Sequence, residues 1–170
     1  KQVIKIEEPT DKYKELARSQ SIYCLLQTEQ FDSLLEMADT FQQEHEDSDH
    51  VATVAYYQGI ALFHSEKFAP AAKAFSRALD NKKDPASWGS YIDILRYLAD
   101  CYTQMEKFDK AATVYRQLAH TDDSDIDTIA TLMKAADLLN KAGKQQKAIS
   151  LYQQILQHEK AVKTDIENAI

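Results

Sequence analysis

The stretch Glu-Lys-Phe-Asp-Lys-Ala-Ala at residues 106–112 decides the fold, because the chain contains close copies of it. The nearest copy is Glu-Lys-Phe-Ala-Pro-Ala-Ala at residues 66–72, and fainter copies begin at Glu29 and Gly143. Aligning the copies gives separations of 37, 40 and 37 residues between Phe31, Phe68, Phe108 and Gln145. A period in this range is typical of stacked helical repeats. The sequence therefore predicts a repeat array.

The composition indicates that the repeats are helical. The chain has 170 residues, of which 44% are hydrophobic and only three are Gly and three Pro. So few turn-forming residues favour long helices over β-hairpins and long loops. We therefore expect an all-α protein with a continuous core.

Apolar residues at helical spacing divide the chain into four repeats of two helices each. We expect one domain over residues 11–158, with repeats at 11–47, 48–84, 85–123 and 124–158. Residues 1–10 read as an extended lead-in. Residues 159–170 read either as a capping helix or as the start of a truncated fifth repeat. The spacing of 40 is explained by a longer first helix in the third repeat, beginning at Asp84-Pro85.

Small residues recur where the two helices of a repeat have to cross. Three repeats place a small residue on the first helix and another twelve residues later on the second. Helices joined by a short turn approach closely only where neither carries bulk. The three pairs are Gly59 with Ala71, Ala99 with Ala111, and Ala136 with Ala148.

An aromatic residue follows four positions after each of these second small residues, at Phe75, Tyr115 and Tyr152. Together with the small pairs, this pattern resembles the tetratricopeptide repeat. The resemblance covers about residues 11–158 and is weakest in the first repeat. It implies a right-handed superhelical solenoid of stacked antiparallel helix pairs, in which the first helices line a concave groove.

By this resemblance, the groove is rich in aromatic side chains in its first half. Exposed aromatic residues offer large contact areas with a polar tip, as anchors of protein interfaces do. Any one of these tyrosines could instead pack between helices. The candidate groove residues are Tyr23, Tyr56, Tyr57, Ile60, Phe63, Arg96, Tyr97 and Lys134.

The leading hypothesis is a non-enzymatic scaffold or adaptor that binds a peptide or helix of a partner protein. Tyr56, Tyr57, Phe63 and Tyr97 would be the apolar anchors, while Arg96 and Lys134 would set register against acidic groups. The alternative is a structural role, in which the chain self-associates through its C-terminal end.

One partner within the resembling family can be set aside. Members that bind the carboxylate tail of heat-shock chaperones present a Lys, Asn, Asn, Lys, Arg set in the groove. The corresponding positions here are Ser19, Tyr23, Tyr57, Asp93 and Tyr97. None of them matches, so we expect no chaperone-tail binding.

Charge and motifs argue against other classes of function. The net charge is −7 without a basic stripe, which disfavours nucleic acid. No apolar run approaches the roughly 18 residues of a membrane span. Three glycines cannot build most phosphate loops, and the acidic-histidine run at residues 44–50 lacks the EF-hand spacing. We expect no enzyme activity, cofactor or metal site.

The two cysteines, Cys24 and Cys101, occupy equivalent positions in the first and third repeats. Packed helices lie roughly 8–10 Å apart, so two repeats would hold these residues beyond disulfide reach. We expect both to be buried free thiols. Free thiols favour the cytoplasm, and a bacterial periplasmic or envelope location stays open.

Overall fold

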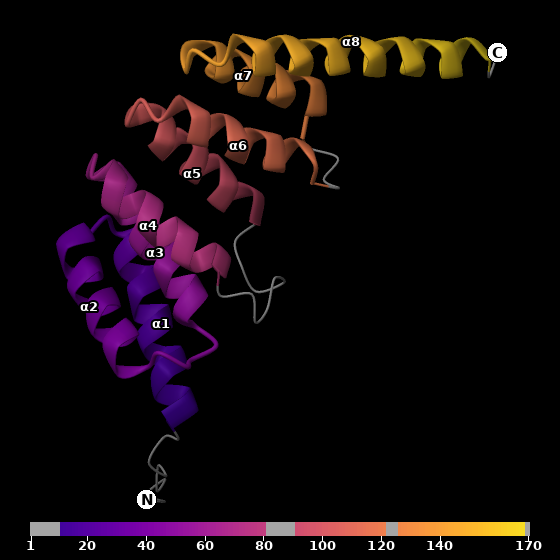
Figure 1. Ribbon diagram of the computed structural model, residues 1–170. Coiled ribbons are helices and arrows are strands. Elements are labelled where there is room, and N and C mark those ends of the chain that lie inside the picture. Colours follow the sequence, from indigo (N-terminus) through magenta and orange to yellow (C-terminus); the bar gives the residue numbers. More distant parts are fainter. Residues whose placement is uncertain (1–10, 81–90, 122–125, 169–170) are drawn as a thin grey trace, which may run out of the picture. The chain divides into compact units, whose positions relative to one another are not determined.

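The computed structural model describes residues 11–80, 91–121 and 126–168, with side chains as far as residue 157. These residues form eight α-helices and no strand (Figure 1). The helices are α1 (Asp11–Gln27), α2 (Phe31–Glu44), α3 (Val51–His64), α4 (Phe68–Asp80), α5 (Tyr91–Gln104), α6 (Phe108–Ala119), α7 (Thr128–Lys141) and α8 (Gln145–Asn168). The predicted all-α class is confirmed.

Consecutive helices pack as hairpins. The pairs α1 with α2, α3 with α4, α5 with α6 and α7 with α8 each form a hairpin, and α2 and α6 also pack against the next helix along the chain. The small residues at the predicted crossings are buried, as at Ala99 and Ala111. At Gly59 the space above the backbone is filled by the Phe75 ring, which would lie 2.6 Å from an added Cβ. The small pairs therefore let the helices of each hairpin approach closely.

The repeated stretch forms the turn between the helices of each hairpin. Glu29, Glu66 and Glu106 have φ of 55°, 57° and 56°, and Gly143 has φ of 73°. Each turn makes the same two backbone hydrogen bonds. In the turn at Glu66, one of them runs from the amide of Lys67 to the carbonyl of Leu62 at 2.9 Å. This left-handed residue with a six-to-one bond is a Schellman ending, which satisfies the last carbonyls of the first helix. The sequence stretch recurs along the chain because each hairpin closes with the same turn conformation.

The chain divides into two compact units, Lys1–Gly89 (unit 1) and Ser90–Ile170 (unit 2). That the four repeats form one domain over residues 11–158 stays a prediction. Unit 1 has a core cluster of its own, contributed by α1, α2 and α3. Its fully buried members are Ile22, Leu34, Ala38, Phe41, Val51, Val54 and Ala61. In unit 2 the fully buried residues include Ile94, Leu95, Ala99, Ala111, Ala112, Ala135 and Ala136.

The C-terminal boundary differs from the expectation. We expected the fourth repeat to end at residue 158 and a separate helix to follow, but α8 continues without a break from Gln145 to Asn168. No Gly or Pro lies in this range to interrupt the helix. The lead-in at residues 1–10 and the helix start at Asp84-Pro85 lie outside the described residues. Within the described ranges, no helix is long and apolar enough to cross a membrane.

Candidate protein-binding surfaces

Two tyrosines predicted for the groove meet between α1 and α3. The ring centroids of Tyr23 and Tyr57 are 5.4 Å apart, at a tilted angle of 41°. The Tyr57 ring also lies 5.8 Å from that of Tyr56. Because Tyr23 keeps 40% of its surface exposed, this contact reaches the solvent. The two residues are 34 positions apart in the sequence, and both are among the predicted groove residues.

Two further predicted residues follow Tyr56 along α3. Ile60 and Phe63 come four and seven positions after Tyr56, the spacing of one helix face. All three are half-buried. The Phe63 ring meets Phe68 of α4 edge-on, with centroids 5.6 Å apart. We call the set Tyr23, Tyr56, Tyr57, Ile60 and Phe63 the aromatic surface.

Tyr57 takes part in the core as well as in this surface. It is half-buried and packs against the core cluster of unit 1. Burial, and to a smaller degree the neighbouring Tyr23, raises the pKa of Tyr57. The aromatic surface is therefore anchored in the core of unit 1 through Tyr57.

The other three predicted residues belong to unit 2. Arg96 and Lys134 are exposed and line one pocket of about 300 Å³ between α5, α6 and α7. Each has a carboxylate nearby, because Arg96 Nη1 lies 3.8 Å from Asp93 Oδ1 and Lys134 Nζ lies 3.9 Å from Asp100 Oδ1. The pocket therefore presents both signs of charge.

Tyr97 is half-buried on α5. Burial first, then the carboxylates of Asp93 and Asp100, raise the pKa of Tyr97. Its hydroxyl therefore stays protonated well into the alkaline range.

A tyrosine–aspartate pair recurs in unit 2, and the sequence analysis missed it. The Tyr115 hydroxyl donates to Asp100 Oδ1 at 2.6 Å, and the Tyr152 hydroxyl donates to Asp137. Both pairs span fifteen residues and join the two helices of one hairpin. Lys134 Nζ lies 4.3 Å from the centre of the Tyr115 ring. The signal available in the sequence was the repeated fifteen-residue interval itself.

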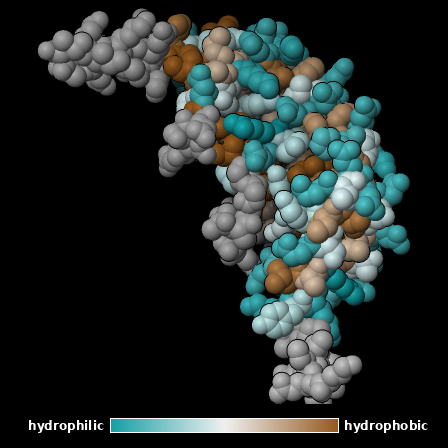
Figure 2. Space-filling model, turned by 180° about the vertical axis from the view of Figure 1, so that it is seen from behind, coloured by the Kyte–Doolittle hydropathy of each residue, from teal (hydrophilic) through white to brown (hydrophobic). Residues whose placement is uncertain are grey.

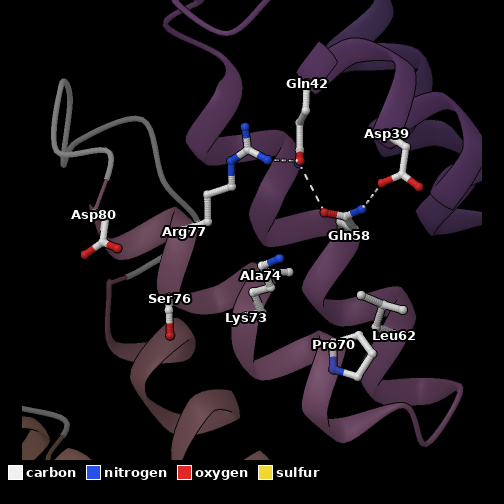
Figure 3. A pocket seen from close by; sticks show the side chains of 10 residues that line it. All are labelled: Asp39, Gln42, Gln58, Leu62, Pro70, Lys73, Ala74, Ser76, Arg77 and Asp80. Carbon is white, nitrogen blue, oxygen red and sulfur yellow. Dashed lines mark hydrogen bonds between the residues drawn. The ribbon is translucent and has the colours of Figure 1, made fainter.

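Unit 1 has a pocket on the side of α2 and α4, and the sequence analysis did not predict it. This pocket has a volume of about 580 Å³, and Figure 3 shows a chain of polar side chains at its edge. Gln42 Oε1 accepts from Arg77 Nη1 at 2.5 Å, Gln42 Nε2 donates to Gln58 Oε1 at 3.1 Å, and Gln58 Nε2 donates to Asp39 Oδ1 at 2.6 Å. Gln42 is only 6% exposed. The sequence could have predicted the burial of Gln42, because this residue lies four positions after the buried Ala38 on the same helix face.

The acidic-histidine run and the cysteines were also considered as sites. Among the described residues, no group of three or more His, Cys, Asp or Glu is placed to hold a metal ion. Ser48 instead donates to Glu15 at 2.6 Å, which ties this run to α1. Cys101 is buried, and burial raises the pKa of its thiol to about 12. The expectation for Cys24 was wrong, because Cys24 is exposed.

Comparison with known proteins identifies the repeats. The tetratricopeptide repeat family matches residues 93–122 and 130–159. Unit 2 therefore contains two tetratricopeptide repeats. The two matches cover the hairpin α5–α6 and the hairpin formed by α7 with the first part of α8.

Solved structures show the same fold at low sequence identity. The MamA protein gives a TM-score of 0.62 at 18% identity, covering 88% of this chain and 75% of that one. BtubC from P. vanneervenii gives 0.62 at 16% identity, covering 94% and 68%. TPR-like repeats of a kinesin light chain type from P. anserina give 0.58 at 13% identity, covering 91% and 76%.

A sequence relative is a soluble NSF attachment protein homolog of Fowlpox virus (strain NVSL). It is 30% identical over 106 residues, which is 62% of this chain. The chain spans 34% of the length of that relative.

Proposed function

We propose that the chain is a protein-binding module, and that the aromatic surface of unit 1 holds a segment of the partner protein. The tetratricopeptide fold is consistent with a protein-interaction scaffold, since stacked helical repeats present extended binding surfaces. The specific claim concerns Tyr23, Tyr56, Tyr57, Ile60 and Phe63. They would hold apolar side chains of a helical or extended segment.

The observation that carries this proposal is the ring contact between Tyr23 and Tyr57. It joins an exposed ring on α1 to a ring anchored in the core on α3. A rigid aromatic side chain loses little conformational entropy when a ligand covers it, and its hydroxyl can still bond to water or to the ligand. The surface therefore combines apolar area with little reorganisation on binding.

Unit 2 would contribute differently. The carboxylates beside Arg96 and Lys134 reduce the net positive charge that these two side chains offer. Their role in setting register against acidic groups of the ligand stays a prediction.

The test begins with a random peptide library displayed on phage and selected against the purified full chain. Affinities of the selected peptides are then measured by fluorescence anisotropy for the wild type and for Tyr23→Ala. We expect binding to weaken by about tenfold or more, as at interface hot spots. Tyr13→Ala is the matched control, because Tyr13 is 65% exposed on the same helix but lies about 15 Å further along its axis.

Two outcomes would reject the proposal. One is a library that yields no peptide bound through apolar side chains. The other is a selected peptide whose affinity is equal for the wild type and for Tyr23→Ala. Tyr57→Phe separates packing from hydrogen bonding, since it keeps the ring in the core and removes only the hydroxyl.

A further inference from the structure

The outer face of α8 presents large apolar residues at positions that are covered in other repeats. The fifth and twelfth residues of α8 are Ile149 and Leu156, and they are 47% and 56% exposed. The corresponding residues of α6 are Ala112 and Ala119, which are 0% and 4% exposed. The fifth and twelfth positions therefore hold larger side chains in α8 than in α6, and in α8 these side chains are exposed to solvent.

The covering element in the other repeats is a helix. The next helix along the chain packs against α6, and in unit 1 another packs against α2. At the fifth and twelfth positions of α2, Leu35 is half-buried and Gln42 is buried. For α8, the described helix that packs against it is α7, which lies on its hairpin side. Figure 2 shows hydrophobic surface beside the grey C-terminal end of the chain.

The charge on this helix limits what can cover it. Residues 145–157 contain no Asp or Glu, and Lys147 is their one charged residue, although the chain as a whole has a net charge of −7. Five glutamines lie at positions 145, 146, 153, 154 and 157. Gln145 and Gln153 lie four residues before and after Ile149 on the same helix face, whereas Gln146 and Gln154 line a pocket with Arg116 of α6. Glutamine both donates and accepts hydrogen bonds, so a glutamine-rich face can pair with a copy of itself.

We propose that the outer face of α8 packs against α8 of a second copy of the chain, forming a two-fold symmetric dimer. Ile149 and Leu156 of both copies form the apolar centre, and Gln145 and Gln153 form its rim. In a two-fold arrangement the exposed apolar residues of both copies are covered at once, because an isologous contact uses the same surface patch on each copy. This proposal is independent of the aromatic surface, which lies in unit 1.

The dimer is expected to be weak. A standard protein interface takes 20 to 30 residues from each side, and one helix face supplies fewer. We therefore expect a dissociation constant of about 10–100 µM. Sedimentation equilibrium over roughly 5–500 µM should show the mass of the chain rising from one copy to two.

Ile149→Lys combined with Leu156→Lys brings four like charges to the centre of the dimer and should keep the protein monomeric at every concentration. Because both side chains are exposed, the far-UV circular dichroism should match the wild type. Leu16→Lys is the control, since Leu16 is an exposed apolar residue of α1, and this variant should dimerise as the wild type does.

Three results would overturn the proposal. The first is a wild type that remains monomeric over the whole range. The second is a double lysine variant that associates as strongly as the wild type. The third is a mass that grows beyond two copies, which would indicate head-to-tail stacking instead of a two-fold contact.

Discussion

Single residues in the hairpin turns determine how each helix pair closes. Three turns use Glu at φ near 55° and the fourth uses Gly143 at φ of 73°. A side chain costs about 1 kcal/mol or more in this left-handed conformation, which glycine adopts freely. The three glutamates are therefore tolerated at a cost, and glycine would suit the same positions better.

We predict that Glu66→Gly stabilises the protein by about 1 kcal/mol and that Gly143→Ala destabilises it by a similar amount. An added Cβ at Gly143 meets no atom within 4 Å, so the second effect would come from backbone conformation alone. Urea unfolding followed by circular dichroism measures both changes. Equal stabilities for all three proteins would contradict this account of the turns.

Gly59 is restricted by contact instead of by conformation. A Cβ there would lie 2.6 Å from Cε1 of the fully buried Phe75. Alanine gains up to about 1 kcal/mol in helix propensity, but overpacking a core costs about 1–3 kcal/mol. We predict that Gly59→Ala lowers the unfolding free energy by about 1 kcal/mol. Combining it with Phe75→Leu should cost less than the sum of the two single changes, and simple additivity would count against the steric explanation.

Buried polar groups join neighbouring helices within each unit. In unit 1, Gln42 of α2 links Arg77 of α4 to Gln58 of α3. Removing it leaves hydrogen-bonding groups without their partner and opens a cavity. We predict that Gln42→Ala lowers the unfolding free energy by about 2–3 kcal/mol. Gln43→Ala, at the exposed next residue, should change it by less than about 0.5 kcal/mol, and equal effects of the two would show that the network contributes little.

The hydrogen bond between Tyr115 and Asp100 predicts a specific alkaline response. Burial, followed by the Asp100 carboxylate, raises the pKa of Tyr115 above its ordinary value of 10.0. Below pH 10 both folded and unfolded states hold this proton, so stability does not vary through this group. Above pH 10 the unfolded state loses the proton first, and stability falls by up to about 1.4 kcal/mol per pH unit.

Tyr115→Phe removes this titration. The variant should be about 1 kcal/mol less stable near pH 8, because it lacks the hydrogen bond. Its stability should then fall less steeply than that of the wild type between about pH 10 and 11. Urea unfolding at several pH values gives both curves. Parallel curves would mean that the hydroxyl titrates alike in the folded and unfolded states.

Across the whole chain, the sequence predicted the repeated turns and helix crossings, and it missed the recurring tyrosine–aspartate pairs and the contacts that do not repeat. The turn at Glu106 and the small pair Ala99–Ala111 recur at a fixed period, so their geometry could be inferred without coordinates. The bond between Gln42 and Arg77 joins helices across a repeat boundary, and no pattern marks it. The continuity of α8 past residue 158 was missed because a fall in apolar spacing resembled a helix end.

The candidate surface was predictable to a similar extent. The resemblance to the tetratricopeptide repeat placed Tyr23 of the first repeat and Tyr56, Tyr57, Ile60 and Phe63 of the second in one groove. Periodicity could not reveal that Tyr57 also packs against the core, since this depends on how closely α1 approaches α3. Nor could it reveal the Asp100 carboxylate beside Lys134, because that contact joins two different helices, whereas Asp93 and Arg96 lie three residues apart on α5.

The most direct measurement of the central claim is an NMR titration of the chain, labelled with ¹³C on its tyrosine rings, with a library-selected peptide. The account predicts that the ring signals of Tyr23, Tyr56 and Tyr57 shift together as the peptide is added, while the signal of Tyr13 stays in place. A peptide that binds tightly but leaves these three signals unchanged would contradict it.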